Sequence, residues 1–364
     1  MADRTKYVDR EIPQISLACF DARLDEITSQ LCAAAEHVGF FAIVDHGIAP
    51  ADVSTMFALS ERFFALPDAL GAGIPDPALD GRRARPQGVV PAAVRREHVV
   101  GLWLGDEHLP GFRDRCLAFM HRLQRVSERL MVCLARGLGF ADDEYFVQYH
   151  DASKPGCQSV MRLLHYFETP KMIPAGEDGT GDNDKKGQRR RVYHRAGAHA
   201  DWGFLTLLFE KEGQSGLEIC PGRDVVADQH HHSLDDAAWS KVHFVPGSIV
   251  CNIGDLLMSW SDDRFKSTFH RVKAPPRRTR RQLRRAVLDC PCKEALIQGP
   301  LKKHPLVTGE EFNARAMSTH FAALQARLRA KEEGGAAEAG TGGGEDRMKN
   351  SSIAAAGSGT SCCV

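Results

Sequence analysis

The sequence predicts a mixed α+β protein, with a helical N-terminal region followed by a core of mainly β-structure. Two observations support this prediction. Apolar residues recur at helical spacing up to about residue 150, whereas after residue 155 the chain breaks into short segments punctuated by Gly and Pro. Several short strands separated by turn residues are typical of a sandwich or jelly roll rather than of a parallel sheet.

The first elements alternate between strand and helix. Residues 11–17 alternate and predict a short edge strand, with Pro13 near its start. Residues 22–37 place apolar side chains at helical spacing, and residues 39–47 predict a compact strand that ends in a turn. A second helix follows and stops at Pro67.

A long amphipathic helix is predicted over residues 109–139, and Gly139 ends it. Residues 68–100 are rich in Pro, Gly, Ala and Arg and predict an extended loop before this helix, and residues 142–150 predict a short helix after it. The predicted apolar side of the long helix consists of Phe112, Cys116, Phe119, Leu123, Val126, Leu130 and Leu134.

The second half of the chain predicts a series of short strands. A polar insert at 174–191 interrupts them, and residues 308–311 (TGEE) form a capping box that begins a helix running to about residue 331. From residue 334 the chain is mainly Gly, Ala and Ser, which predicts a disordered tail. The predicted strands are 159–167, 192–200, 203–210, 216–220, 242–245, 248–252, 265–273 and 282–289.

These elements divide the chain into four regions. We expect an N-terminal region with the long helix at 1–154, a β core at 155–300, a C-terminal helix at 301–332 and the disordered tail at 333–364.

Composition argues against several classes of partner. The chain has 47 basic and 47 acidic residues, so its formal net charge of zero gives no overall field that favours nucleic acid. No apolar run approaches the ~20 residues that a membrane helix needs. The start of the chain lacks the apolar segment of a secretory signal, and eleven irregularly spaced cysteines suit a reducing compartment. By elimination we therefore expect a cytoplasmic protein without nucleic-acid or membrane partners. We also expect a monomer.

The most informative motif is the pair His199 and Asp201, which begins an apolar segment. Alternation along a strand would place both side chains on one face, and His270 arriving from a paired strand would add a second imidazole. Two histidines and one carboxylate bind Fe(II) and leave coordination positions open for oxygen and a co-substrate. On spacing alone, a hydrogen-bonded His–Asp pair beside an unrelated core histidine is the alternative interpretation.

The order of the motifs resembles the isopenicillin-N-synthase-like branch of the 2-oxoglutarate- and Fe(II)-dependent oxygenases. The resemblance covers roughly residues 10–330 and implies a double-stranded β-helix with Fe(II) bound inside its mouth. The motifs are IPQI (12–15), GFFAIVDHG (39–47), MRLLHY (161–166), RAGAHAD (195–201), GFLTLL (203–208), PG (246–247), NIGD (252–255) and STFHRV (267–272).

The resemblance also implies where the co-substrate binds. Arg280, ten residues after His270, would bind the distal carboxylate of 2-oxoglutarate, and Gln282 stands where the family has Ser. Tyr166 would either contact the co-substrate or be an ordinary core aromatic residue. The strand that follows carries Arg284 and Arg285 where the family is apolar. A core strand does not readily bury unpaired guanidinium groups, so these arginines are paired, the strand is distorted, or the local sequence is anomalous.

The implied function is oxidation of a small organic substrate by O2, with 2-oxoglutarate as co-substrate and succinate and CO2 as products. Some members of the same fold take electrons from the substrate or from ascorbate, so an iron oxidase that does not use 2-oxoglutarate stays open. A non-catalytic binding protein on this scaffold is the third possibility. The sequence names neither the substrate nor the outcome, which could be hydroxylation, desaturation or ring closure.

Overall fold

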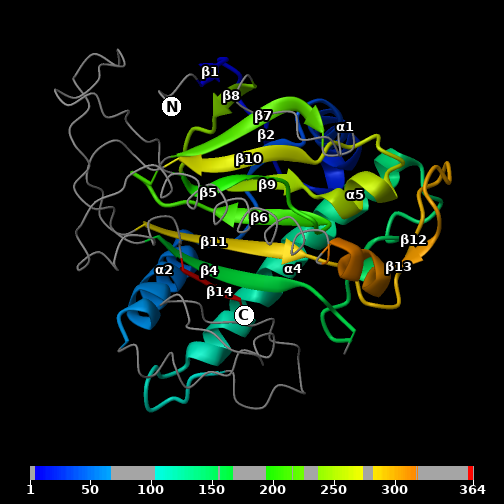
Figure 1. The fold of residues 1–364 in the computed structure, drawn as a ribbon. Helices are drawn as coiled ribbons and strands as arrows, with labels where there is room; N and C mark the ends of the chain where they lie inside the picture. Colours follow the sequence, from blue (N-terminus) through cyan, green and yellow to red (C-terminus); the bar gives the residue numbers. More distant parts are fainter. Residues whose placement is uncertain are drawn as a thin grey trace, which may run out of the picture.

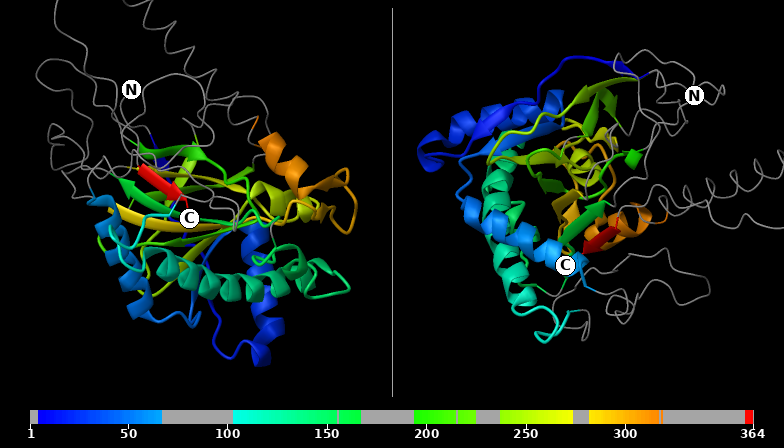
Figure 2. Two further views of the ribbon diagram at one scale, coloured as in Figure 1. Left: turned by 90° about the horizontal axis from the view of Figure 1, so that it is seen from below. Right: turned by 90° about the vertical axis from the view of Figure 1, so that its left-hand side faces the viewer.

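The fold consists of two facing β-sheets with helices on the outer side of the larger sheet (Figures 1 and 2). This computed structural model describes residues 5–66, 103–154, 156–166, 194–214, 216–224, 237–273, 282–316, 318 and 360–363. The helical N-terminal region and the two-sheet jelly roll confirm the predicted fold class.

The larger sheet has seven strands and combines segments from both halves of the chain. Its strands in spatial order are β14 (Thr360–Cys363), β4 (Val160–Tyr166), β11 (Gln282–Asp289), β6 (Leu205–Phe209), β9 (Ile249–Ile253), β3 (Phe40–Val44) and β2 (Gln14–Ser16). Strand β11 pairs antiparallel with β4 on one side and β6 on the other, so it is a regular interior strand despite its arginines.

The smaller sheet has five strands and lies opposite the larger one. Its strands in spatial order are β1 (Lys6–Tyr7), β8 (Ala238–Lys241), β7 (Leu217–Asp224), β10 (Thr268–Lys273) and β5 (His194–His199). A separate two-stranded hairpin joins β12 (Leu296–Ile297) to β13 (Val307–Thr308).

Apolar side chains fill the space between the two sheets. Phe40 and Val250 of the larger sheet pack in one cluster with Ile219 and Val272 of the smaller sheet. Ala286 and Leu288 of β11 pack with residues of β4 and β6 on the same inner side. The space between the two sheets is therefore lined in large part by apolar side chains.

Three helices pack on the outer face of the larger sheet: α1 (Leu24–His37), α2 (Pro50–Phe64) and α4 (Phe112–Leu138). All seven residues predicted for the apolar side of α4 are buried. The helix ends as predicted at Gly139, whose φ of 81° is a left-handed conformation that glycine adopts readily. Figure 2 shows α4 running along the sheet.

Several boundaries differ from the sequence prediction. The strand expected at 242–245 lies earlier, at β8, and the short helix expected at 142–150 is only a 3-10 turn, η2 (Val147–Tyr149). A short 3-10 turn, η1 (Asp21–Arg23), precedes α1, and α5 (Asp255–Trp260) follows β9 where no helix was predicted. The predicted loop at 68–100 and the polar insert at 174–191 lie outside the described residues.

The C-terminal part agrees with the prediction at the capping box. Thr308 N donates to Glu311 Oε2 at 2.8 Å, and Glu311 N donates to Thr308 Oγ1 at 3.2 Å, at the start of a helix over residues 309–316. Within the tail predicted to be disordered, residues 360–363 form β14, which pairs along β4. The rest of that tail lies outside the described residues.

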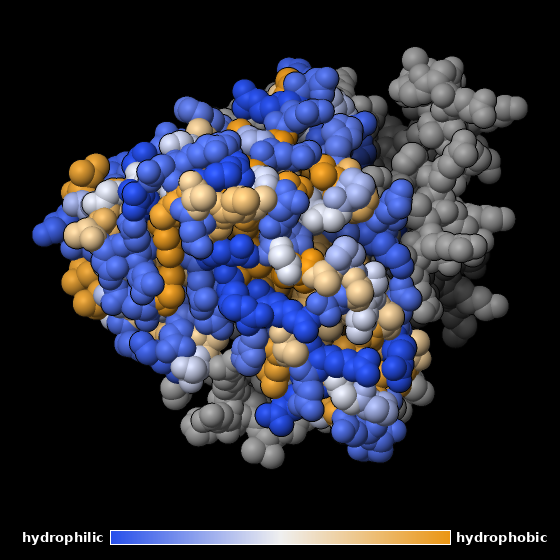
Figure 3. Space-filling model, turned by 180° about the vertical axis from the view of Figure 1, so that it is seen from behind, coloured by the Kyte–Doolittle hydropathy of each residue, from blue (hydrophilic) through white to orange (hydrophobic). Residues whose placement is uncertain are grey.

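The face of the molecule seen in Figure 3 is mainly hydrophilic. Figure 3 shows small, scattered apolar patches on the face opposite that of Figure 1. Large exposed apolar side chains include Leu296, Leu301 and Leu306 around the hairpin of β12 and β13. Among the described residues, no helix combines the length and the apolar character that crossing a membrane requires.

Asp289, the last residue of β11, is a buried carboxyl group that joins the sheet to α4. Its side chain accepts a hydrogen bond from Ser127 Oγ of α4, and its main-chain oxygen accepts one from Phe204 N at 2.8 Å. Burial raises the pKa of Asp289 to about 7, although the hydrogen bond from Ser127 acts in the opposite direction. The ionised carboxylate is therefore disfavoured in the folded protein.

We predict that Asp289→Asn stabilises the protein more at high pH than at low pH. The unfolded chain ionises this group near its ordinary pKa of 3.8, whereas the folded protein resists ionisation up to about 7. The free energy of unfolding of the wild type should therefore fall as pH rises through this interval, and Asn avoids that loss while still accepting a hydrogen bond from Ser127. Chemical denaturation at about pH 5 and about pH 8 measures the difference.

The exposed Asp9→Asn is the control and should change stability equally at both pH values. An Asp289→Asn effect that does not depend on pH would contradict the prediction.

Candidate metal centre

Strand pairing brings His199, Asp201 and His270 together. His199 is the last residue of β5, and His270 lies directly opposite it in the adjacent strand β10. Opposed residues in an antiparallel pair point to the same side of the sheet, here the inside of the barrel. Asp201 lies two residues beyond His199, just past the end of β5, so the turn toward β6 rather than strand alternation directs its carboxylate.

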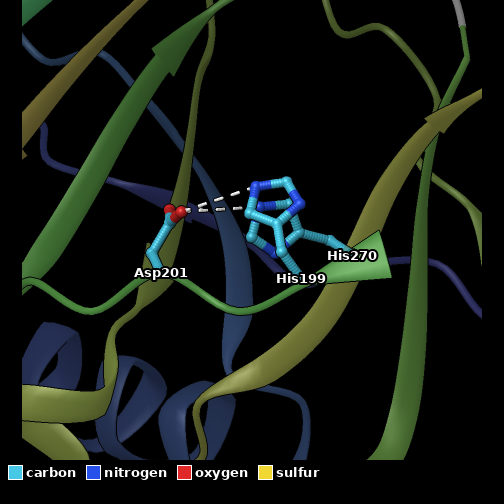
Figure 4. Close-up of side chains that lie close together, drawn as sticks. All are labelled: His199, Asp201 and His270. Atoms are coloured by element: carbon cyan, nitrogen blue, oxygen red, sulfur yellow. Dashed lines mark ion pairs between the residues drawn. The ribbon is translucent and has the colours of Figure 1, made fainter. Parts of the chain in front are cut away.

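Both imidazole rings face the carboxylate (Figure 4). Asp201 Oδ1 is 3.8 Å from His199 Nε2 and 3.7 Å from His270 Nε2, and the ring centroids are 4.2 Å apart. These nitrogen–oxygen distances exceed those of a good hydrogen bond, which leaves space for an ion between the three groups. His270 is buried, while His199 and Asp201 are partly exposed toward the mouth of the barrel.

Main-chain carbonyl groups orient both histidines. His199 Nδ1 lies 2.7 Å from the carbonyl oxygen of Gly197, and His270 Nδ1 lies 3.2 Å from that of Thr268. A carbonyl oxygen can only accept, so each neutral ring carries its hydrogen on Nδ1. The lone pair of each Nε2 then faces Asp201, as a metal-binding histidine requires.

Two donors from neighbouring strands hold the carboxylate. Thr206 Oγ1 and Asn252 Nδ2 donate to Asp201 Oδ2 at 2.6 and 2.9 Å. The two donors are directly opposed in the pairing of β6 with β9. Because both bind Oδ2, Oδ1 remains directed at the histidines.

The sequence prediction missed Thr206 and Asn252. Thr206 was counted within the predicted strand 203–210 and Asn252 within the predicted strand 248–252, and neither was given a role in the site. Two signals were present: a hydroxyl group in an otherwise apolar segment, and a buried amide that needs a partner.

The pKa values of Asp201 and His270 favour binding of a metal cation. Burial raises the pKa of Asp201, but His270, His199 and the two donated hydrogen bonds outweigh it and hold the pKa at about 2. Burial lowers the pKa of His270 to about 4, against the opposing effect of Asp201. At neutral pH the site therefore offers an ionised carboxylate and a neutral His270 imidazole, which are the protonation states that bind metal.

The donor set fits Fe(II). Among the described residues, His199, Asp201 and His270 form a group of side chains that could share one metal ion. Their donor atoms all lie within 4.8 Å of one another. Two imidazoles and one carboxylate on one side leave the other positions of a six-coordinate ion open.

The residues expected to bind the co-substrate are only partly described. Tyr166, at the end of β4, is buried, and the guanidinium carbon of Arg195 lies 5.6 Å from its ring centroid. Gln282 lies opposite Tyr166 in the pairing of β11 with β4. Arg280 lies outside the described residues.

Comparison with known families matches both halves of the chain. The family described as the 2OG-Fe(II) oxygenase superfamily matches residues 160–291, which contain all three candidate ligands. The family described as the non-haem dioxygenase in morphine synthesis N-terminal region matches residues 12–70.

Curated relatives from several kingdoms are similar over most of their length. UPF0676 protein C1494.01 of Schizosaccharomyces pombe is 26% identical over 73% of this chain and 78% of its own length. The 2-oxoglutarate-dependent dioxygenase frbA of Dothideomycetidae sp. is 28% identical over 66% of this chain and 70% of its own. The flavonol synthase/flavanone 3-hydroxylase of Matthiola incana is 25% identical over 83% and 91%.

Solved structures share the fold. A full-length Neurospora crassa protein, crystallised in complex with alpha-KG and thymine, has a TM-score of 0.64 at 24% identity, covering 85% of this chain and 97% of that chain. The rice dioxygenase for auxin oxidation has a TM-score of 0.57 at 20% identity, covering 85% and 96%. With two family matches in the expected order around this ligand set, the chain belongs to the 2-oxoglutarate- and Fe(II)-dependent oxygenase superfamily.

We predict that Thr206→Val weakens Fe(II) binding about 10- to 100-fold, the usual cost of losing a partner that orients a metal ligand. Valine has the shape of threonine but cannot donate a hydrogen bond to Asp201 Oδ2. Thr206→Ser keeps the hydroxyl group and should bind Fe(II) nearly as well as the wild type. Anaerobic Fe(II) titration measures both variants, and equal affinities for Val and Ser would show that the hydrogen bond does not position Asp201.

Proposed function

We propose that this protein oxidises a small organic substrate with O2 and 2-oxoglutarate, and that His199, Asp201 and His270 bind its Fe(II). The observation that supports this most strongly is the convergence of two imidazoles and one carboxylate, whose donor atoms lie within 4.8 Å of one another. In a hydroxylation, one oxygen atom of O2 enters the substrate and the other enters succinate, while 2-oxoglutarate loses CO2. Bound iron supplies the redox chemistry that activates O2.

The residues of the chain position and protect this chemistry. His199 and His270 bind through Nε2, and Asp201 binds through Oδ1. Thr206 and Asn252 keep Oδ2 occupied, so Asp201 binds through one oxygen atom only and further positions stay open. Apolar residues between the sheets exclude bulk water from the inner side of the site, which limits side reactions.

The co-substrate is expected next to Tyr166. Its burial and its position beside Arg195 support a role in binding an acidic ligand, because the phenol can donate one hydrogen bond. The resemblance to the family assigns the distal carboxylate of 2-oxoglutarate to Arg280, with Gln282 beside it, and this assignment stays a prediction.

The relatives support a small-molecule substrate. Their names and bound compounds refer to thymine, flavonols and auxin, which are small organic compounds of different chemistry. We therefore expect this protein to act on a small organic compound, but the relatives do not indicate which one. We further propose that the protein acts as a monomer in the cytoplasm, without nucleic-acid or membrane partners. The balanced charge and nine free cysteines among the described residues support this.

We predict that His199→Ala or His270→Ala abolishes Fe(II) binding, because a two-ligand remnant cannot compete with water for the ion. Asp201→Glu should bind more weakly, since the longer side chain moves the carboxylate away from Thr206 and Asn252. Anaerobic titration of the wild type should show about one equivalent of Fe(II).

His304→Ala is the control, because His304 is not one of the three candidate ligands and its Nε2 lies 2.9 Å from Asp263 Oδ1. Wild-type iron affinity in both His199→Ala and His270→Ala would sink the ligand assignment.

Product analysis separates the proposed function from its alternatives. An iron-loaded 2-oxoglutarate oxygenase slowly forms succinate from 2-oxoglutarate and O2 even without its substrate. An iron oxidase that uses ascorbate would consume O2 without forming succinate, and a binding protein would do neither. Succinate that depends on both iron and O2, and that disappears in His270→Ala, is the expected result.

A further inference from the structure

The chain just before β4 lies against the chain just after β11. Lys293 N donates a hydrogen bond to the main-chain oxygen of Gly156 at 2.9 Å, so the two segments stay in contact beyond the ends of the strands. Cys157 follows Gly156, and Cys292 precedes Lys293. In an antiparallel pair these neighbours also face each other. The two thiol groups are hydrogen-bonded to each other.

Further hydrogen bonds hold the two segments in this position. Ser159 Oγ donates to the main-chain oxygen of Cys290 at 3.0 Å and accepts from Cys290 N at 3.1 Å. Gln158 Nε2 donates to the main-chain oxygen of Pro291 at 3.1 Å. A disulfide requires two cysteines that already face each other at close range, and this pair of segments supplies them.

The two cysteines differ in their access to solvent. Cys157 is partly exposed, whereas Cys292 is buried. The hydrogen bond with Cys157 and burial raise the pKa of Cys292 above its ordinary value, so Cys292 stays protonated at neutral pH. A reagent dissolved in water therefore meets Cys157 first and finds Cys292 directly behind it.

A second pair of neighbouring cysteines lacks this access. Cys32 of α1 and Cys133 of α4 are close enough to influence each other electrostatically, but both are buried where the two helices pack. Burial is the main cause that raises the pKa of Cys32 to about 11. Because neither sulfur is open to solvent, we expect this second pair to stay reduced while the protein is folded.

We propose that Cys157 and Cys292 form a site of reversible oxidation, at which hydrogen peroxide converts the two thiols into a disulfide that ties β4 to β11. This inference does not depend on the proposed function. Disulfides in reducing compartments are usually transient ones of this kind. A small-molecule dithiol reverses the reaction by thiol–disulfide exchange.

The reaction has two steps. Peroxide first oxidises Cys157 to a sulfenic acid, and one water molecule is released. The sulfur of Cys292 then attacks the sulfur of Cys157, so that the S–S bond forms, the S–O bond breaks and a second water molecule leaves. The two thiols together lose two electrons and two protons, which peroxide takes up in forming two water molecules.

The disulfide would fix the end of β11 that lies beside the turn between Asp201 and β6. A Cβ atom on Gly203 would stand 3.2 Å from Cys290 Sγ, and Phe204 N donates to the main-chain oxygen of Asp289 at 2.8 Å. The cross-link joins residues far apart in the sequence, so it restricts the unfolded chain strongly. We therefore expect the oxidised protein to resist thermal unfolding better than the reduced protein.

Peptide mapping after peroxide treatment tests the proposal. The full-length chain is kept in EDTA, because iron and peroxide together form radicals that oxidise side chains unselectively. Remaining thiols are alkylated after unfolding, and mass spectrometry identifies the linked peptides. The expected result is a peptide that joins Cys157 to Cys292 and is lost on treatment with dithiothreitol, while Cys32 and Cys133 are recovered alkylated. The Tm of the oxidised protein should be higher by about 5 °C.

Cys157→Ser is the decisive variant, because its position is partly exposed and serine fits the same space. It should form no disulfide to Cys292, and peroxide should leave its Tm unchanged. Cys292→Ser should behave in the same way, but the inference does not require this buried variant to fold. The matched control is Cys19→Ser, which removes an exposed cysteine elsewhere and should keep both responses of the wild type.

Three results would overturn the proposal. One is a disulfide from Cys157 to Cys290 in place of Cys292. Another is oxidation of Cys157 to a sulfinic acid while Cys292 is recovered alkylated. The third is a peroxide-induced rise in Tm that persists in Cys157→Ser. None of these results would bear on the proposed function, because the experiment uses neither iron nor 2-oxoglutarate.

Discussion

The antiparallel pairing of β5 with β10 is the constraint on which the site depends. It sets His199 directly opposite His270 and points both rings into the barrel, although the two residues are far apart in the sequence. A shift of one residue in this register would turn one ring to the other face of the sheet and remove the site. The main-chain carbonyl groups that orient the rings belong to the same two strands, so position and tautomer have one origin.

The smaller sheet carries the two histidines, and the larger sheet holds the carboxylate of Asp201 in place. Thr206 and Asn252, which are opposed residues of β6 and β9, donate hydrogen bonds to Asp201 Oδ2. The geometry of the metal centre therefore depends on how the two sheets face each other. Helices α1, α2 and α4 pack on the far face of the larger sheet and bury its apolar side chains, which fixes that sheet in place.

Two buried ionisable side chains, Asp289 and Arg284, each have a polar partner. Asp289 carries a carboxyl group into the contact between β11 and α4, where burial favours the neutral form and a hydrogen bond satisfies it. Arg284 cannot be neutralised in this way, because a guanidinium group stays protonated at any physiological pH. The ion pair with Glu210 compensates its charge, while its Nε and Nη1 have no hydrogen-bond partner among the described residues.

Local sequence signals determined several helix boundaries and the spacing of two candidate metal ligands. The helical spacing of α4, its end at Gly139, the reciprocal capping box of Thr308 and Glu311, and the spacing of His199 and Asp201 depend on residues close together in the chain. The tertiary structure alone decided that Thr206 and Asn252 hold Asp201, that Arg284 is buried beside Glu210, and that the strand expected at 242–245 lies at β8. Each of these depends on which strands pair and in which register, and that is set by contacts between distant segments that no local pattern encodes.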